Sequence, residues 1–423
     1  MSTPSTPVSS GSRKFAKSVI EIWLWGGPSQ LETFDPKPDA PNDYNNGLKT
    51  IRTNAGFDIH EWCPELAKCA DLYSVIRSMT HPFFGHETAT YLMQTGRNPG
   101  GGVTYPALGA LISSSRVPGK GNSVMKGMEY EGELAPFVIM TYAKGRFSEV
   151  GFLGEAYAPL VTGGRASAKV FEVDGIVPPG GLTKAQIQDR FDRCHRLDRL
   201  PFDPEFEAAG AAARQIILGK AAETFDLTRE KESVRKRYGT MLNGNGYTEI
   251  GQQLLCARRL VEYGVPYVSI NYNGWDSHKR HFESMKRPTA EMDMAVSALL
   301  LDLKEHGLLD STIVWLSGEF GRVPKVDRQP PWNGGRNHFP RCFSALVAGG
   351  GFKGGQVVGK SDDTTDHVKE RPVTPQDFLG SIMELAGVDP EDRLPNNKWL
   401  KEYGPVMNPQ TPSECGRLKE IYA

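Results

Sequence analysis

The stretch "VPYVSINYNGWDSHKRHF" (residues 265–282) joins a strand pattern to a cluster of potential metal ligands. Apolar and polar side chains alternate along residues 267–272, and this period of two predicts a β-strand. Asp276, His278 and His281 follow within a few residues. They are therefore expected on a turn at the carboxyl end of a strand, as a metal site, a proton-transfer site or only a polar turn.

Strand patterns alternate with helical ones on both sides of this stretch. Such alternation predicts a mostly parallel sheet covered by helices on both faces, and in such sheets ligands bind at the carboxyl ends of the strands. A charged segment at about 183–240 predicts a helical insertion or cap. The expected strands are 18–27, 135–142, 265–272, 311–318 and 341–351, and the expected helices are 87–96, 248–264, 289–307 and 374–387.

Composition excludes several classes of partner. The 423 residues include 49 Lys and Arg and 50 Asp and Glu, so a net charge of −1 indicates neither nucleic acid nor an anionic membrane as a partner. No apolar run reaches the roughly 18 residues that span a bilayer. The six cysteines are scattered without a CxxC pair, and the polar Ser/Pro-rich leader at 1–17 has no export signal, so a reduced, cytoplasmic setting is expected.

Several loops expected at the carboxyl edge of the sheet carry side chains that could share one site. His and carboxylate side chains at strand ends are ligands for Zn, Mn or Fe, and a guanidinium fork suits a phosphate or sulfate group. Together these groups would suit metal-assisted attack on an anionic ester. The candidate residues are His86, Asp276, His278, Glu319, Arg322, Arg336 and His338.

Each candidate also has a structural alternative. A single loop histidine is more often a hydrogen-bonded structural residue, and Arg322 could pair with Glu319 or cap a strand. His278 is favoured over His281 as a ligand, because Lys279 and Arg280 lie between them and cations beside a metal ion are unfavourable. If Asp276 and His338 lie more than about 10 Å apart, one metal ion cannot bridge them.

The motifs "WLWGGPSQLETFDPKPDAP", "HETATYLMQTGR", "WDSH", "GEFGRVP", "GRNHFP" and "VAGGGFKGGQVVG" resemble the DUF1501 family over about residues 18–390. That family is related to the alkaline phosphatase and sulfatase superfamily. The resemblance implies an α/β/α sandwich with a two-metal site of Asp and His at strand ends. It also implies a Ser, Thr or modified Cys nucleophile nine residues before a Thr-Gly pair.

The chain departs from the superfamily pattern at several of these places. Counting back nine residues from Thr95-Gly96 gives His86 where the nucleophile is expected. Gly26-Gly27 stands where an Asp usually follows the first strand, and Glu319-Phe320 replaces a later Asp-His pair. The family's Gly-Arg-Asp-His is here Gly335-Arg336-Asn337-His338. A covalent intermediate on Ser or Thr is therefore not expected.

The resulting expectation is an alkaline phosphatase/sulfatase-like α/β/α sandwich at residues 18–400 with a helical insertion, followed by a C-terminal extension at 401–423. The expected activity is metal-dependent hydrolysis of sulfate or phosphate esters, and the alternative is an inactive binding or assembly protein. Asp276, His278 and His338 are the expected ligands of a divalent ion (Zn, Mn or Ca). His86, Glu319, Arg322 and Arg336 are the expected catalytic groups, acting on a small anionic ester or a carbohydrate.

Overall fold

An eight-stranded sheet forms the centre of the fold. The computed structural model describes residues 14–117, 127–141, 149–154, 157–163, 173, 176, 182–197, 204–239, 246–390 and 416–423. The strand order is β12-β4-β11-β8-β1-β7-β5-β6. In chain order these strands are β1 (Ser18–Trp25), β4 (Tyr73–Met79), β5 (Phe137–Met140), β6 (Leu160–Val161), β7 (Tyr267–Asn273), β8 (Thr312–Ser317), β11 (Phe343–Ala348) and β12 (Val357–Val358).

Strand directions bring several loops to one edge of the sheet. β1 pairs in parallel with β7 and β8, and β5 pairs in parallel with β7. β11 is antiparallel to both of its neighbours, β8 and β4, so β4 runs in the same direction as β8. The carboxyl ends of β1, β4, β7 and β8 and the amino end of β11 therefore share one edge. The prediction of a mostly parallel sheet is confirmed.

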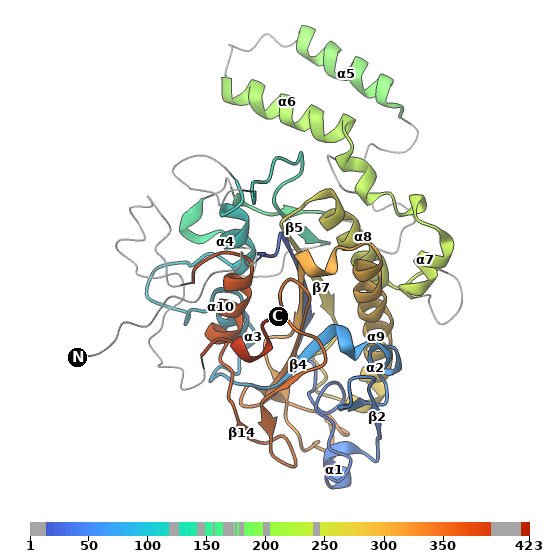
Figure 1. Cartoon of the computed structure of the whole chain (residues 1–423), viewed down its shortest axis with the longest axis vertical. Coiled ribbons are helices and arrows are strands. Elements are labelled where there is room, and N and C mark those ends of the chain that lie inside the picture. Colours follow the sequence, from blue (N-terminus) through green and yellow to red (C-terminus); the bar gives the residue numbers. More distant parts are fainter. Residues whose placement is uncertain are drawn as a thin grey trace, which may run out of the picture.

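Helices cover both faces of the sheet (Figure 1). Alternation along β1 sets the two cores: Ile20, Ile22 and Leu24 belong to one buried cluster, whereas Val19 and Trp23 belong to the other. The first cluster is closed by α2 (Pro64–Lys68), α8 (Glu249–Tyr263) and α9 (His281–Glu305). The second is closed by α3 (His86–Thr95), α4 (Leu108–Ser114) and α10 (Pro375–Leu385). These three layers confirm the predicted sandwich.

Two helices begin at the residues that the sequence predicts. The hydroxyl of Thr248 accepts a hydrogen bond from the Gly251 N–H at the start of α8, and Thr374 caps α10 through the Asp377 N–H. α8 ends at Gly264, whose φ of +105° lies in the left-handed region. Local capping therefore fixes where these helices start and stop relative to the sheet.

The charged segment forms helices, as predicted. α5 (Lys184–Leu197) and α6 (Pro204–Leu218) project from the body of the protein in Figure 1, and α7 (Glu232–Arg237) leads back towards α8 and α9. The remaining α-helix and strands are short and lie outside the central sheet. They are α1 (Asn42–Asn45), β2 (Thr50–Arg52), β3 (Asp58–His60), β9 (Gly321–Arg322), β10 (His338–Phe339), β13 (Lys360–Ser361) and β14 (Val368–Glu370).

Two differences between the structure and the sequence prediction concern β4 and α9. β4 has no counterpart among the predicted strands, although its seven residues are almost wholly buried. α9 begins at His281 instead of residue 289 and contains Pro288. Proline removes one backbone hydrogen bond and is typical of helix starts, so a helix that extends upstream of it is not evident from the sequence.

The described ends of the chain pack against the body. The Ala16 N–H donates to the Leu385 carbonyl, and Leu418 and Ile421 belong to the second buried cluster. The greater part of the predicted leader (1–13) and residues 401–415 of the predicted extension lie outside the described residues. Among the described helices, none is long and apolar enough to cross a membrane.

One buried acid on β1 should make stability depend on pH. Glu21 faces the second cluster and accepts hydrogen bonds from Gln94 Nε2 at 2.6 Å and from the Tyr267 hydroxyl at 2.8 Å. Burial raises the pKa of Glu21 to about 7, and these hydrogen bonds only partly offset it. The folded chain thus keeps this proton to a higher pH than the unfolded chain.

We expect Glu21→Gln to flatten the pH profile of stability. The unfolded carboxyl loses its proton near pH 4.5 and the folded one near pH 7, so wild-type stability falls as pH rises between these values. The contribution is on the order of 1–3 kcal/mol. Urea unfolding at pH 5 and pH 8 should show the variant gaining stability relative to wild type at pH 8. Parallel profiles for the two proteins would contradict this, because the shared slope would then come from other titrating groups.

Candidate metal centre

The loop after β1 must lie directly against the loop after β7 for the site to form. Gly26 has a φ of +111°, in the left-handed region that favours glycine. A Cβ at this position would lie 2.2 Å from the backbone nitrogen of Asp276. The Trp275 N–H also donates to the Trp25 carbonyl at 3.2 Å. Glycine at position 26 is therefore what allows Asp276 to reach the end of β1.

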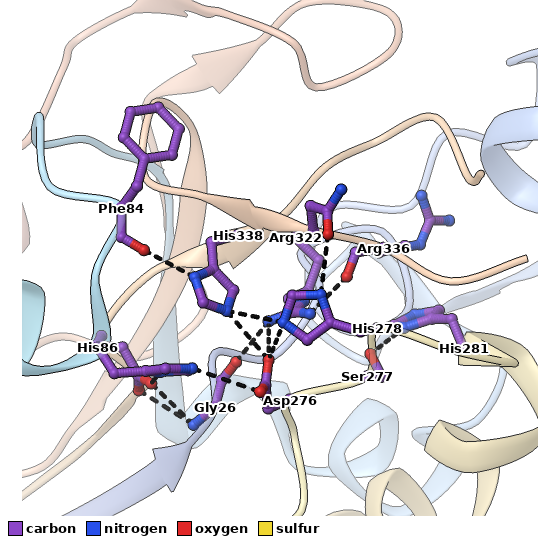
Figure 2. Close-up of polar contacts among 12 residues, drawn as sticks. Gly26, Phe84, His86, Asp276, Ser277, His278, His281, Arg322, Arg336 and His338 are labelled. Carbon is purple, nitrogen blue, oxygen red and sulfur yellow. Dashed lines mark hydrogen bonds and ion pairs between the residues drawn. The ribbon is translucent and has the colours of Figure 1, made fainter. Parts of the chain in front are cut away.

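The Asp276 carboxylate lies at the centre of a histidine cluster (Figure 2). Its Oδ1 is 2.9 Å from His278 Nε2 and 3.2 Å from His338 Nε2, and its Oδ2 is 3.4 Å from His86 Nε2. The Nε2 atoms of His278 and His338 are 3.1 Å apart. Residues that follow β4, follow β7 and precede β11 thus converge on one carboxylate, and Asp276 and His338 lie well within the distance that a shared metal ion requires.

The other nitrogen of each ring, Nδ1, contacts an oxygen atom. Carbonyl and carboxylate oxygens only accept hydrogen bonds, so each Nδ1 carries a proton and donates it. A neutral ring then has its lone pair on Nε2, the atom that faces Asp276. The three contacts are His338 Nδ1 to the Phe84 carbonyl (2.7 Å), His278 Nδ1 to Asn337 Oδ1 (2.9 Å) and His86 Nδ1 to Glu319 Oε1 (2.5 Å).

This arrangement suits a cation. Lone pairs directed at a carboxylate repel it unless a proton or a metal ion lies between them. Two ligands about 2.0–2.2 Å from a tetrahedral metal ion lie roughly 3.4 Å apart, close to the spacings observed here. One ligand atom from each of His86, Asp276 and His338 also lies within 4.8 Å of the others. The donor set of imidazoles and one carboxylate fits Zn or Mn, whereas Ca²⁺ takes oxygen ligands.

A buried carboxylate orients His86. Glu319, two residues after the end of β8, is fully buried and accepts hydrogen bonds from the Gly26 N–H at 3.0 Å and from His86 Nδ1. His81 in turn donates from Nε2 to the Glu319 carbonyl at 2.6 Å, and burial lowers the pKa of His81 to about 4, so this ring stays neutral. Trp25 stacks on His86 with its ring centroid 5.9 Å away. Glu319 therefore positions a ring instead of facing the centre of the cluster.

The charges of the cluster stabilise one another. Burial would raise the pKa of Asp276, but hydrogen bonds from His338 and His86 and the Arg322 guanidinium outweigh it and hold that pKa well below its usual range. Hydrogen bonds to Asp276 and Glu319 raise the pKa of His86 to about 9, against the opposing effect of burial. Without a metal ion, the lone pair of His86 is thus shielded by a proton.

The structure corrects the expectation that two arginines hold a substrate anion. Arg322 is fully buried, and its Nη1 donates to Asp276 Oδ1 at 2.7 Å and to the Gly26 carbonyl at 2.9 Å. Arg336 is 1% exposed, and it donates to Glu32 and to the carbonyls of Val323, Pro324 and Tyr44. Both guanidinium groups bind parts of the protein itself, so neither is presented to a ligand.

His281 lies outside the cluster, in agreement with the preference for His278. It is fully buried, and its Nε2 donates to Glu32 Oε2 at 2.8 Å while its Nδ1 accepts from the Ser277 hydroxyl at 2.5 Å. Burial lowers the pKa of His281 to about 4, so this ring is neutral. Glu32 also binds Arg336. This network holds the Asp276–His278 turn from behind.

Sequence reasoning thus found the residues that converge but not those that support them. His86, Asp276, His278 and His338 form the cluster, with Glu319 behind His86. The supporting contacts from Gly26, Asn337 and the Phe84 carbonyl were not predicted. Asn337 was noted only as a departure from the family motif, and a backbone carbonyl such as that of Phe84 leaves no signal in a sequence.

The fold and the cluster define a three-layer α/β protein with a histidine–carboxylate site at the sheet edge. The chain belongs to the DUF1501 family, described as a protein of unknown function, whose model matches residues 16–399. No curated protein matches the chain in sequence.

The solved structures that match this chain share little sequence with it. Ps i-CgsB, crystallised with a neocarrahexaose, is 13% identical, with 94% of this chain and 76% of that chain covered and a TM-score of 0.39. A sulfatase from Pseudoalteromonas sp. is 13% identical, with 89% and 68% covered and a TM-score of 0.36. TAB5 alkaline phosphatase, a mutant with Mg bound, is 11% identical, with 89% and 100% covered and a TM-score of 0.34.

We expect Gly26→Ala to destabilise the protein more than Gly274→Ala does. Gly274 has a similar φ of +106°, but a Cβ there would meet nothing within 4 Å, so its substitution adds only backbone strain of about 1–3 kcal/mol. Gly26→Ala adds a clash with the Asp276 backbone. Urea unfolding of both variants should show an extra loss of at least about 1 kcal/mol for Gly26→Ala. Equal losses would mean that the close approach of the two loops is not required.

Proposed function

We propose that this chain is a metal-dependent hydrolase of sulfate or phosphate esters, with a divalent ion held by Asp276, His278 and His338. The observation that carries the proposal is the convergence of Nε2 lone pairs on one carboxylate, with each Nδ1 fixed by an oxygen. A triad of two histidines and one carboxylate leaves coordination positions open, as catalytic sites require. The metal ion would supply Lewis acidity towards an ester oxygen and towards water.

His86 and Glu319 form the acid–base part of the proposed site. His86 Nε2 faces Asp276 Oδ2, away from the tighter triangle around Oδ1. Its Nδ1–H is held by Glu319, as in a general base oriented by a carboxylate. In this role His86 takes a proton from the attacking water or gives one to the leaving group; in the alternative role it is a fourth ligand.

The nucleophile in this proposal is water. The position where the superfamily resemblance implies Ser, Thr or modified Cys is occupied by His86, whose ring is already held by Glu319. The nearby Ser277 hydroxyl donates to His281 and is 5% exposed. Direct attack by water, without a covalent intermediate, is the chemistry that these residues favour.

Exposed cations next to the cluster favour an anionic substrate. Lys279 and Arg280 directly follow His278, and Arg341 lies three residues after His338 with its guanidinium 6.0 Å from the Phe84 ring centroid. All three are exposed, unlike Arg322 and Arg336. They replace the two buried arginines as the groups proposed to attract a sulfate or phosphate ester, including one carried on a carbohydrate.

One observation favours the alternative, a non-catalytic binding protein. Arg322 already neutralises Asp276 at 2.7 Å, and a protonated His86 completes a network that is satisfied without a metal ion. In that case His86, Asp276 and His338 would serve stability and binding only.

Metal content and turnover separate the two functions. Chain dialysed against a chelator and then against Zn or Mn should bind one equivalent and hydrolyse p-nitrophenyl sulfate or p-nitrophenyl phosphate. His338→Gln should abolish both properties while the thermal unfolding midpoint stays close to wild type. Asp276→Asn should abolish them too, but with a lower midpoint, because it removes the charge partner of the buried Arg322. His195→Gln, at an exposed position on α5, is the matched control and should change neither.

Three outcomes are distinguishable in this experiment. Metal binding with turnover that depends on His338 supports the hydrolase. Metal binding without turnover on either substrate supports the binding protein. Sub-stoichiometric metal with every ion added would overturn the metal centre itself and support the binding protein with its metal-free network.

The hydrogen bond between His278 Nδ1 and Asn337 gives an independent test of His278 as a metal ligand. Asn337→Leu removes the acceptor of the His278 Nδ1–H without touching the Nε2 atom that faces Asp276. Loss of such an orienting partner typically weakens metal affinity by about 10–100-fold, and we expect a loss in this range from competitive titration with a chromophoric chelator. Gln329→Leu, an exposed change in the same loop, should leave the affinity unchanged. Equal affinities for all three proteins would show that His278 is not a ligand.

A further inference from the structure

Two large aromatic side chains lie next to the histidine cluster. Phe84, between β4 and α3, is 47% exposed, and its carbonyl accepts a hydrogen bond from His338 Nδ1 at 2.7 Å. Trp332, between β9 and β10, is half-buried, and its ring centroid lies 6.3 Å from that of His278. Each of the two histidines proposed as metal ligands therefore has its own aromatic neighbour.

The backbone is fixed at both aromatic positions. Phe84 is tied to His338 through its carbonyl, and it lies two residues before His86, the first residue of α3. The Trp332 carbonyl accepts a hydrogen bond from the Arg280 N–H at 3.2 Å. These hydrogen bonds use main-chain atoms of the two aromatic residues, so a change of either side chain leaves them in place.

The cluster is open to solvent beside these rings. The side chains of Asp276, His278 and His338 are 39%, 33% and 20% exposed. His338 lies between Asp276 and Phe84, because its Nε2 contacts the carboxylate and its Nδ1 contacts the Phe84 carbonyl. Figure 2 shows the Phe84 ring pointing away from the carboxylate. An ester held at Asp276 would therefore meet Phe84 with its alcohol part, whereas its sulfate or phosphate group stays at the cluster.

The Phe84 ring offers an uncovered aromatic face. The Arg341 guanidinium lies 6.0 Å from its centroid and leaves nearly half of the side chain exposed. A single exposed phenylalanine needs no explanation, but here a second aromatic side chain flanks the same cluster. Aromatic faces stack on other flat rings and bury apolar surface against them, and the C–H face of a sugar ring presents such a surface. The two side chains therefore suit a ligand whose organic part is a ring.

We propose that Phe84 and Trp332 determine substrate specificity at this site, by binding the ring of a sulfate or phosphate ester whose alcohol part is an aromatic or sugar ring. This inference rests on the proposed function for the place of the anionic group, at Asp276 and His338. An ester of a short-chain alcohol would fill only that place and would gain nothing from the two aromatic side chains.

Titration calorimetry with phosphonates tests this preference without relying on turnover, because a carbon–phosphorus bond replaces the ester bond. The probes are methylphosphonate, phenylphosphonate and the phosphonate analogue of glucose 1-phosphate, each added to full-length chain with and without Zn. We expect at least one ring-bearing probe to bind about fivefold or more tightly than methylphosphonate, as one aromatic contact provides. The probe with the larger gain distinguishes an aromatic from a sugar ring. Phe84→Ala or Trp332→Ala should bring the ratio of the ring-bearing and methyl affinities close to one.

Three control variants separate specificity from a structural role. Phe84→Tyr and Trp332→Phe keep an aromatic ring, so both should retain the wild-type ratio of affinities. Leu197→Ala removes a 77% exposed apolar side chain on α5 and should also retain it. A merely structural defect would weaken the binding of every probe alike and leave the ratio unchanged.

The outcomes for the ring preference and for the hydrolase are separate. A ring preference that is lost in Phe84→Ala or in Trp332→Ala supports the inference even if no ester is hydrolysed. Equal affinities for all three probes, an unchanged ratio in both alanine variants, or no saturable binding up to about 10 mM with or without Zn would each overturn it. Turnover of the p-nitrophenyl esters alongside such a result would leave the proposed hydrolase standing.

Discussion

The site depends on one buried cation, the guanidinium of Arg322. It binds the Asp276 carboxylate, the Gly26 carbonyl and the Arg336 carbonyl, and so joins the loops that follow β1 and β7 to the segment that leads into β11. Removing a guanidinium from water is costly unless all of its surroundings compensate, and a buried pair that loses one partner destabilises the fold strongly. The positions of the three loops therefore depend on one another through Arg322.

Hydrogen bonds to the Nδ1 atoms determine the tautomers and orientations of the histidine rings in the cluster. Each ring uses Nδ1 to bind a fixed oxygen, and three different segments supply those oxygens: Glu319 after β8, Asn337 before β10 and the Phe84 carbonyl after β4. These contacts select the tautomer that directs every Nε2 at Asp276. The presence of several histidines and one aspartate does not by itself distinguish a candidate metal centre from a group of surface histidines. The position of the proton on each ring, at Nδ1, makes that distinction.

Much of the fold was predictable because periodicity reports burial on one or two faces. The alternating run before Asp276 and the capped helices α8 and α10 were of this kind, and the order of strand and loop brought Asp276, His278 and His338 to one edge. The roles of Arg322 and Arg336 were not predictable, because the sequence does not show whether a guanidinium meets solvent or buried carbonyls. The sequence predicts the start of α9 at residue 289 instead of His281. Pro288 and the polar residues before it give no helical pattern for the first two turns.

The reversed direction of β11 has a consequence for how such a site can change. β8 ends at the site edge and β11, its neighbour in the sheet, begins there, so residues 318–342 leave and return at the same place. Glu319, Arg322, Asn337 and His338 all belong to this one excursion. A change in the length or sequence of this segment would alter His338 and the residues that orient the cluster at the same time. The order and direction of the strands in the sheet would not have to change. His338 and the residues that contact His86, Asp276 and His278 are thus carried on one excursion between two strands, whereas Asp276 itself follows β7.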